Sequence, residues 1–357
     1  MPNLLAVLLC GLPFFSLANE APNEMRLSQR PDVQIFIDEM STRHGMDRSM
    51  LSAVLDQIQL KPRILAILDR PSTSRPWYEF RPNFVENQRI RQGVAFWYKH
   101  AKTLETISNH YEIPPEYLIA IVGVETMYGS NTGSFRVADA LATIAFDYPR
   151  RAEYFRGQLE QFLLLAREEG NDPLSFRGSY AGAMGVPQFM PSSFREYAVD
   201  WDGDHHRDIW TNPADILASI ANYFHAHGWK IGEPLVARAK VEGSGFQPLV
   251  DDKFNLHYTV EQLASFGVKP AEAVPASRQA VLVPLDVAPD RTEYWLGFNN
   301  FYVLTRYNKS TLYAMAVHEL ARKIRAAYED PLLLPPAPKQ AAKPAKASKS
   351  ARKHRRS

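Results

Sequence analysis

The sequence predicts a mainly α-helical protein with a small β-rich insertion, and two observations lead to this assignment. Apolar residues recur at helical spacing through most of the chain, and prolines and glycines separate the periodic stretches. After Gly228 the pattern changes to β-branched and aromatic runs, broken by Gly, Pro and Asp, which are typical of strands. With 357 residues, 45% of them hydrophobic and 22% charged, the chain suits about two or three modest domains with buried cores.

Residues 1–18 are predicted to be an export signal. They contain an apolar run that ends in Ser-Leu-Ala at 16–18, which fits the small-x-small pattern of a cleavage site. The run is too short to span a membrane, and a buried N-terminal helix is the alternative. The only cysteine, Cys10, follows Leu9 rather than a small residue, so lipidation is not expected. We expect the mature protein in the periplasm, since a chain without cysteine is compatible with oxidising conditions.

Two segments of the mature chain are predicted to be mainly helical. Residues 19–110 form an N-terminal helical domain, in which Pro71, Pro76 and Pro82 mark an irregular stretch between helices. Residues 111–235 form a second helical region, where prolines open the run "IPPEYLIAIVGVETMYG" and a glycine closes it. Further helices are expected at Val137–Phe146, Arg150–Glu169 and Asp215–Gly228.

The rest of the chain holds the insertion, a last helix and a tail. Residues 236–298 are predicted to be the β-rich insertion, and residues 299–330 a segment whose helix completes the helical part. One face of that helix carries Tyr313, Ala316, Val317 and Leu320.

Residues 331–357 are rich in Pro, Ala and Lys and are predicted to be a disordered tail. Its last part, from Lys339 to Ser357, has eight basic residues and no acid, although the whole chain has a formal net charge of only +2. Such a tail attracts anionic surfaces of the cell envelope, and a solvated tail without a task is the alternative. A role with nucleic acid is not expected in an exported protein.

Glu125 is the candidate catalytic residue. In the run "AIVGVETMYGSNTG" it follows Leu118, Ile121 and Val122 at i, i+3, i+4 and i+7, so its carboxyl group lies on an apolar helix face. Loss of water and the negative field at a helix C-terminus both raise the pKa of such a group. A carboxylic acid that keeps its proton near neutral pH meets the requirement for a general acid. A structural glutamate paired with a buried arginine is the alternative.

The stretch "RGSYAGAMGVPQFMPSSF", residues 177–194, is the candidate substrate-binding segment. Its glycines let a ligand approach the backbone, and Gln188 offers a donor and an acceptor. Tyr180 and Phe189 offer flat faces, which suit sugars with N-acetyl groups. Close packing within the protein is the alternative explanation for the glycines.

Five blocks of sequence resemble the lytic murein transglycosylase B family in content and in order. They are "VGVETMYGSNTG", "YPRRAEYF", "GSYAGAMGVPQFMPSSF", "DWDGDHHRDIWTNPADILASIANYF" and "FYVLTRYNKSTLYAMAV". The resemblance covers roughly Val33 to Ala327. It implies a lysozyme-like α+β core with an additional helical domain and the small β-rich insertion.

The resemblance also implies an activity on peptidoglycan glycan strands. Members of the family cleave the β-1,4 bond between N-acetylmuramic acid and N-acetylglucosamine and leave a 1,6-anhydromuramyl end. The catalytic glutamate of the family maps onto Glu125. Its substrate contacts map onto Ser179, Gln188, Tyr223, Tyr307 and Asn308. A monomer is expected.

One carboxylic acid is enough for this reaction. An ordinary glycosidase needs two carboxylates, but Asp139 stands near a helix start, where an anion is often structural. The 6-hydroxyl of muramic acid can then act as the nucleophile, with Glu125 first as acid and then as base. A hydrolytic muramidase and a peptidoglycan-binding scaffold without catalysis are the alternatives, and a glutamate at this position argues against the scaffold.

Two further groups of side chains have both a functional and a structural interpretation. Arg150 and Arg151 of "YPRR" match residues expected near the peptide stem, whose carboxylates arginine binds in bidentate fashion; a solvated helix start is the alternative. Tyr223, Tyr302 and Tyr307 can stack on sugar rings, and core packing is the alternative.

The loop "DWDGDHHRD" predicts a structural calcium ion. Asp200, Asp202 and Asp204 alternate as they do in loops that wrap a hard cation, and the carbonyl of His206 and the carboxylate of Asp215 would complete the site. The match to an EF-hand is partial, because a histidine stands at the usual glycine position. Oxygen ligands favour calcium over zinc. An acidic helix cap is the alternative, and the chemistry itself is expected to need no cofactor.

Overall fold

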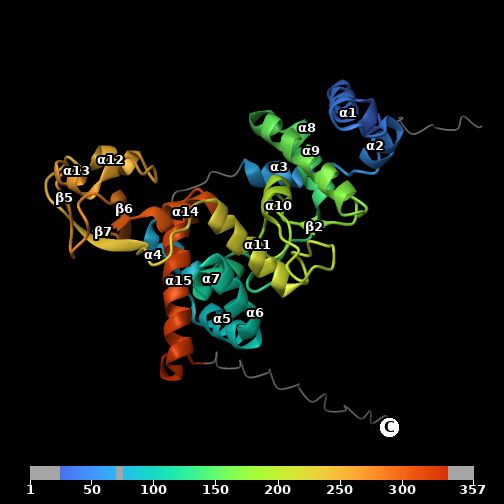
Figure 1. Ribbon diagram of the computed structural model, residues 1–357. Helices are drawn as coiled ribbons and strands as arrows, with labels where there is room; N and C mark the ends of the chain where they lie inside the picture. The colour runs from blue at the N-terminus through green and yellow to red at the C-terminus, as the bar shows by residue number, and fades with distance from the viewer. Residues whose placement is uncertain (1–24, 70–74, 337–357) are drawn as a thin grey trace, which may run out of the picture. The chain divides into compact units, whose positions relative to one another are not determined.

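The structure is a computed structural model that describes residues 25–69 and 75–336 (Figure 1). It divides into two compact units, one ending at Ile58 and the other beginning at Gln59. The predicted signal at residues 1–18 and the basic part of the predicted tail lie outside the described residues. The domain boundaries predicted at 110, 235 and 298 stay predictions. Within the described ranges, no helix has the length and apolar character needed to cross a membrane.

The first unit is a small helical hairpin preceded by a 3-10 turn. It contains η1 (Leu27–Gln29), α1 (Pro31–His44) and α2 (Arg48–Leu55). Helix α1 ends at Gly45, which has a left-handed backbone, and α2 begins with Asp47 accepting a hydrogen bond from the Met50 N–H at 2.8 Å. The hairpin core is formed by Val33, Phe36, Ile37, Met40, Leu51 and Leu55.

The second unit contains the remaining elements, most of them helices. Its helices are α3 (Pro62–Leu68), α4 (Trp77–Phe80), η2 (Arg81–Asn83), α5 (Asn87–Lys99), α6 (Ala101–Tyr111), α7 (Pro115–Thr126), α8 (Val137–Asp147), η3 (Pro149–Arg151), α9 (Ala152–Glu168), α10 (Pro191–Tyr197), α11 (Pro213–Ala226), α14 (Asn299–Tyr307), α15 (Thr311–Glu329) and η4 (Pro331–Leu333). The helices predicted from the sequence correspond to α8, α9, α11 and α15 within a few residues. Arg150 and Arg151 differ, because they form the turn η3 before α9 instead of its first residues.

Helix α7 lies at the centre of the second unit. It packs against α5, α6, α11 and α15, as Figure 1 shows. Because neighbours surround it, every residue from Tyr117 to Val124 is buried, and the helix has no solvated face. Pro115 starts the helix at a position where its missing N–H is not needed.

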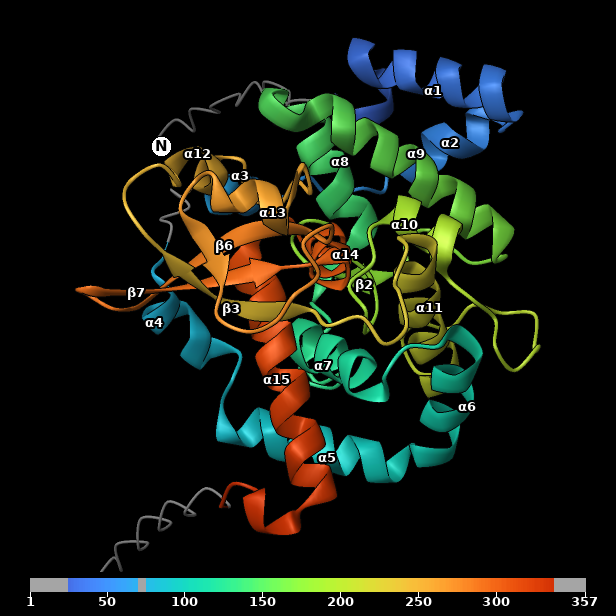
Figure 2. The ribbon, with the colours of Figure 1, turned by 60° about the vertical axis from the view of Figure 1, so that its left-hand side comes forward.

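Two antiparallel sheets complete the unit. The small one pairs β1 (Phe135–Arg136) with β2 (Arg177–Gly178) and joins the loop after α7 to the glycine-rich segment. The larger sheet has the strand order β4-β6-β7-β3-β5. Figure 2 shows β6, β7 and β3 next to one another. Its strands are β3 (Val236–Val241), β4 (Tyr258–Thr259), β5 (Val268–Pro270), β6 (Gln279–Ala288) and β7 (Arg291–Gly297), and its short helices are α12 (Gln247–Asp251) and α13 (Val260–Ala264).

The aromatic run at 293–308 has two conformations. Its first part is strand β7, whereas residues 299–307 form α14 and not a strand. The change occurs where Gly297 meets Phe301, since a Cβ on that glycine would lie 2.5 Å from the phenylalanine ring. Beyond this point the buried residues follow helical spacing, which the aromatic composition alone does not reveal.

Candidate active site

Glu125 is the penultimate residue of α7 and the least buried residue between Tyr117 and Thr126. It lines a cleft of about 550 Å³. The other lining residues are Ser130, Asn131, Thr132, Gly133, Ser134, Phe135, Ser179, Tyr180 and Gln188. The predicted position near the helix end is correct. Because α7 is buried on all sides, however, an apolar face does not distinguish Glu125 from the other residues of the helix. Glu125 is distinguished by its position at the cleft.

A left-handed turn ends α7 directly after the acid. Met127, Tyr128 and Gly129 have φ angles of 51°, 58° and 83°. The Tyr128 N–H donates to the Val122 carbonyl at 3.1 Å, which closes the helix end. A left-handed backbone costs a non-glycine residue about 1 kcal/mol or more, so neighbouring contacts must hold this turn in place.

The Tyr128 side chain supplies such a contact. Its hydroxyl donates to the Arg89 carbonyl at 2.8 Å. A Cβ added at Gly93 or Gly123 would lie 2.6 or 2.5 Å from the same hydroxyl oxygen. The two glycines therefore leave the space that the tyrosine occupies, and the tyrosine holds the turn that positions Glu125.

The pKa of Glu125 is raised to about 7, mainly because burial disfavours the charged carboxylate. The Tyr313 hydroxyl donates to Glu125 Oε1 at 2.5 Å, and this bond lowers the pKa in part. Tyr313 was predicted as a core residue of the last helix, and it is 4% exposed. Its residue type carries one signal of this second role, because a buried tyrosine hydroxyl needs a hydrogen-bond partner.

Replacing Tyr313 with phenylalanine is expected to raise the pKa of Glu125 above about 7, because the hydrogen bond that stabilises the carboxylate is lost. A ¹³C NMR titration of the glutamate carboxyl groups would measure the change. Tyr307→Phe is the matched control, since the Tyr307 hydroxyl donates to the Pro187 carbonyl at 2.7 Å. A lower pKa in Tyr313→Phe would show that this hydroxyl does not stabilise the ionised form.

The alternative of an arginine-paired structural glutamate is not supported. Within residues 25–69 and 75–336, no ion pair involves Glu125, and Glu125 is the one carboxylic acid that lines the cleft. Asp139 lies in the first turn of α8, 3% exposed, and Arg136 contacts its carboxylate at 2.6 Å. Its Oδ1 also accepts the Gln59 N–H at 3.0 Å, so Asp139 has a structural role.

The wall opposite the helix end is built of backbone packed against backbone. Gly133 has φ 94°, and a Cβ there would lie 2.1 Å from the Gly178 carbonyl oxygen. A Cβ on Gly178 would lie 2.2 Å from the Ala183 carbonyl oxygen. Gly182 and Gly185 likewise face protein atoms. The expectation that these glycines admit a ligand is therefore wrong for the three in the segment, and the alternative of close packing explains them.

Ser179 and Gln188 both line the cleft, as the sequence predicted. The Ser179 Oγ accepts the Ala183 N–H at 3.0 Å, which fixes its turn. Gln188 has φ 55°, and its Nε2 donates to the carbonyls of Thr132 at 3.2 Å and Gly185 at 2.9 Å. With both amide hydrogens used, the side-chain oxygen remains as the group that can accept from a ligand.

Tyr223 and Tyr307 lie behind the cleft wall. The Tyr223 hydroxyl donates to the Arg306 carbonyl at 2.7 Å, and the ring is 7% exposed and 4.8 Å from the Tyr307 ring. Tyr307 contacts the Pro187 carbonyl, next to Gln188. Asn308, by contrast, is exposed at the end of α14. The two tyrosines are thus in the packed layer that supports the segment, as the core-packing alternative expects.

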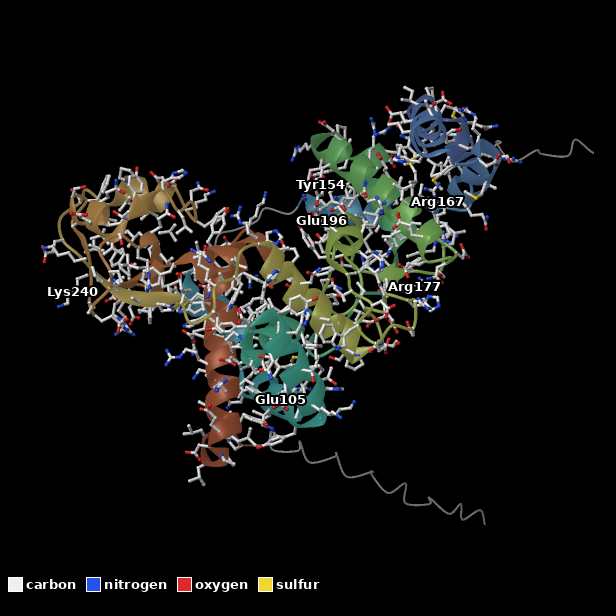
Figure 3. All side chains as sticks on the ribbon, viewed as in Figure 1. Glu105, Tyr154, Arg167, Arg177, Glu196 and Lys240 are labelled. Carbon is white, nitrogen blue, oxygen red and sulfur yellow. The ribbon has the colours of Figure 1, made fainter. Side chains whose placement is uncertain are left out.

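Arg150 and Arg151 are exposed and do not line the cleft. Arg150 lies 3.8 Å from a carboxylate oxygen of Asp69, and the Arg151 guanidinium stands 5.3 Å above the Tyr154 ring. Figure 3 shows Tyr154 on the same side of the unit as Glu196. The structure does not bring these arginines to Glu125.

The predicted calcium loop brings three carboxylates together. Oxygen atoms of Asp200, Asp202 and Asp204 all lie within 4.8 Å of one another. Asp215 is fully buried and accepts the N–H groups of Trp201 at 2.8 Å and Asp208 at 2.9 Å. The His206 N–H donates to Asp204 Oδ1 at 2.8 Å. Asp215, predicted as a further ligand, does not belong to this cluster, because both of its carboxylate oxygens accept backbone N–H groups and brace the loop. The three clustered carboxylates suit a hard cation such as calcium.

Comparisons with known proteins all match transglycosylases. The sequence profile described as "Transglycosylase SLT domain" matches residues 28–322. Membrane-bound lytic murein transglycosylase B of Escherichia coli (strain K12) is 43% identical over 310 residues, which cover 84% of this chain and 84% of that relative.

Solved structures give the same result. Catenated lytic transglycosylase SltB1 from Pseudomonas aeruginosa matches with a TM-score of 0.81 and 45% identity, covering 84% of this chain and 98% of that one. Escherichia coli lytic transglycosylase Slt35 in complex with calcium matches with a TM-score of 0.76 and 42% identity, covering 85% and 95%.

Proposed function

Because this chain belongs to the family of lytic transglycosylases with an SLT domain, we propose that Glu125 is first the acid and then the base of its reaction. The enzyme is a peptidoglycan lytic transglycosylase, which cleaves the bond between N-acetylmuramic acid and N-acetylglucosamine without water. Its structural neighbours are lytic transglycosylases with a lysozyme-like fold, so the predicted fold class is confirmed. Such an enzyme needs no cofactor for its chemistry.

The observation that carries the proposal is a single protonated acid in the cleft. With a pKa of about 7, Glu125 holds a proton at and below neutral pH. It donates this proton to the glycosidic oxygen as the bond to C1 of muramic acid breaks. The resulting carboxylate then takes the proton of the 6-hydroxyl, whose oxygen bonds to C1 and forms the 1,6-anhydro ring. No water is consumed, and Glu125 ends protonated, ready for the next turnover.

The environment of Glu125 suits both steps. Tyr313 stabilises the ionised carboxylate that exists between the two proton transfers. No second carboxylate lines the cleft within the described part of the chain, so no side chain there activates a water as in an inverting glycosidase. Above about pH 7 the acid form becomes scarce, and the cleavage rate should fall.

The products test the mechanism. Purified sacculi would be digested with the wild-type enzyme and with Glu125→Gln, and the muropeptides weighed by mass spectrometry. Anhydromuropeptides are expected from the wild type and almost none from the variant. Reducing ends, which are heavier by one water, would identify a hydrolytic muramidase instead. Binding of sacculi without any cleavage would identify a scaffold.

Substrate contacts follow from the cleft lining. Ser179 and Gln188 are proposed to hold the sugar through their position beside Glu125. Tyr223 and Tyr307 are proposed to fix the wall behind them, and Asn308 to extend the site at its exposed end. Arg150 and Arg151 are proposed to meet stem-peptide carboxylates outside the cleft, where their exposure leaves them accessible.

A structural calcium ion at Asp200, Asp202, Asp204 and the His206 carbonyl is also proposed, with Asp215 as the buried brace of the loop. The calcium complex of Slt35 belongs to a relative of 42% identity. Bound calcium is expected to stabilise the folded protein and therefore to raise its melting temperature. At a hundredfold excess of calcium over its dissociation constant, the free energy of unfolding should increase by about 2.7 kcal/mol. Thermal unfolding with calcium and with EDTA would measure this.

The triple change of Asp200, Asp202 and Asp204 to asparagine is the matched control for the calcium prediction. It should abolish the calcium-dependent shift and leave the melting temperature in EDTA near that of the wild type. An equal shift in this variant would place the ion elsewhere.

Export to the periplasm through residues 1–18 is proposed as well, since the relatives are envelope enzymes. The basic tail is proposed to attract an anionic envelope surface, and the mature enzyme to act as a monomer. We also propose that the chain divides into domains at residues 110, 235 and 298.

A further inference from the structure

A second pocket, which the cleavage mechanism does not use, lies between the larger sheet, α4 and α15. Its volume is about 670 Å³. Strand β7 contributes Arg291, Glu293 and Trp295, which alternate along the strand and therefore share one side of the sheet. Helix α15 contributes residues one turn apart, so they form one face of the helix. The central ones are Met315, Glu319, Arg322, Lys323 and Ala326.

The pocket is on the side of the sheet that its own short helices leave open. The opposite side carries Ala237, Leu282 and Leu296, which are buried against Leu249 of α12 and Leu263 of α13. Strand alternation then directs the polar residues of β7 toward α4 and α15. The sheet thus has one side for its core and one side for the pocket.

The lining has an excess of positive charge. Of its two acids, Glu319 pairs with Arg81 at 2.7 Å and Glu293 with Arg238 at 2.9 Å, and all four residues belong to the pocket. Among the described residues, no carboxylate forms an ion pair with the three remaining cations. These cations are Arg291, Arg322 and Lys323.

Aromatic side chains stand among these charges. Trp77, Tyr78 and Trp295 all line the pocket, and the Arg238 guanidinium stands 4.5 Å above the Trp295 ring. The indole N–H of Trp295 is buried and has no hydrogen-bond acceptor in the described part of the chain. A buried donor without an acceptor is unfavourable, which makes the indole N–H signal sensitive to any change in the pocket around it.

The pocket is separate from the catalytic cleft. No residue lines both. In Figure 3, Lys240 on β3 lies on the far side of α15 from Arg177, which belongs to β2 at the cleft wall. Ligand can therefore occupy the pocket while a glycan strand occupies the cleft.

We propose that this pocket binds an acidic peptide with at least two carboxylates, and that its ligand is the stem peptide of peptidoglycan. Arg291 and Arg322 present planar forks that match carboxylates, and the half-buried rings of Tyr78 and Trp295 offer flat surface to the peptide chain. Paired Glu293 and Glu319 disfavour a densely charged phosphate polymer and tolerate an amino group on the ligand. The choice of stem peptide rests on the proposed function, whereas the acidic character of the ligand rests on the pocket alone.

The test uses the full-length Glu125→Gln protein, so that no glycan is cut, and stem tetrapeptide free of sugar as the probe. Binding is followed by the indole N–H signal of Trp295 in NMR spectra, assigned with Trp295→Phe. We expect the peptide to shift this signal. Arg291→Gln and Arg322→Gln should each weaken binding about tenfold or more, because each removes a charge-assisted contact. Arg63→Gln, an exposed arginine on α3, is the matched control and should leave the affinity unchanged.

Two further probes identify the ligand class. A tetrapeptide with amidated carboxylates should not bind, and inorganic phosphate should not displace the acidic peptide at equal concentration. Binding that survives both arginine changes, absence of any Trp295 shift, or equal competition by phosphate would overturn the proposal. Cleavage of sacculi by Glu125→Gln would instead contradict the proposed function, and it leaves the peptide measurement unaffected.

Discussion

Replacing Glu125 with glutamine is expected to lower the rate of glycan cleavage by about three orders of magnitude or more, since general acid–base catalysis contributes about 10²–10⁴-fold. We expect a loss in the upper part of this range, because the same carboxyl group serves both proton transfers. Glutamine keeps the size of the side chain and can accept the Tyr313 hydrogen bond, so the cleft should keep its shape. Initial rates of soluble muropeptide release from sacculi would measure the loss.

Glu105→Gln is the matched control for this change, because Glu105 is an exposed residue of α6 outside the cleft. It should retain the wild-type rate. If Glu125→Gln released anhydromuropeptides at a comparable rate, another group would have to be the acid.

The same Glu125→Gln change should also stabilise the fold at alkaline pH. The pKa of Glu125 rises from 4.5 to about 7 on folding, so between these values the folded state holds a proton that the unfolded state has lost. The free energy of unfolding therefore falls as pH rises through this window, in total by about 3 kcal/mol for a shift of this size. Glutamine does not ionise and escapes this loss. Urea unfolding at pH 8 and pH 4.5 should show a more stable variant only at pH 8.

Replacing Gly133 with alanine is expected to have the second largest effect. The new Cβ would lie 2.1 Å from the Gly178 carbonyl oxygen, and the φ of 94° is already unfavourable for alanine. The obstacle is backbone, which cannot rotate away as a flexible side chain does. We expect a loss of about 3 kcal/mol or more in the free energy of unfolding, with strain and overpacking both contributing. Urea unfolding would measure it, and the remaining folded protein should have a displaced cleft wall and low activity.

Gly170→Ala separates the two contributions. Gly170 follows α9 with φ 66°, and a Cβ there would meet no atom within 4 Å. Only the backbone conformation is then unfavourable, at about 1 kcal/mol. Equal losses in Gly133→Ala and Gly170→Ala would show that the contact with Gly178 is relaxed in solution.

Periodicity predicted α9, α11 and α15 within a few residues, because each has an apolar face and a proline or glycine near an end. It was least informative at α7, where burial on every side removes the contrast between faces. The burial of α7 is decided by α5, α11 and α15, which are distant in sequence, so local composition does not contain it. The change from β7 to α14 lies at the end of the predicted insertion, and it depends on the packing of Phe301 over Gly297.

For the site, sequence reasoning placed Glu125, Ser179 and Gln188 around what is one cleft in the structure. It placed Tyr313 in the core without its bond to Glu125, and it left the glycines of residues 177–194 open between ligand access and close packing. Both gaps have a common cause. The type of a residue limits the contacts that its side chain can make. Which partner it contacts depends on the fold. The second pocket was not visible for the same reason, because its arginines come from separate strands and helices.

The hydroxyls of Tyr128, Tyr223, Tyr307 and Tyr313 all have partners before any substrate arrives: three donate to backbone carbonyls and one to Glu125. The polar groups around the acid therefore need no reorganisation when a glycan enters. The entropy of arranging them is lost once, when the chain folds, and not again at each turnover. An enzyme of this kind should show little additional ordering of these side chains between its free and its substrate-bound states.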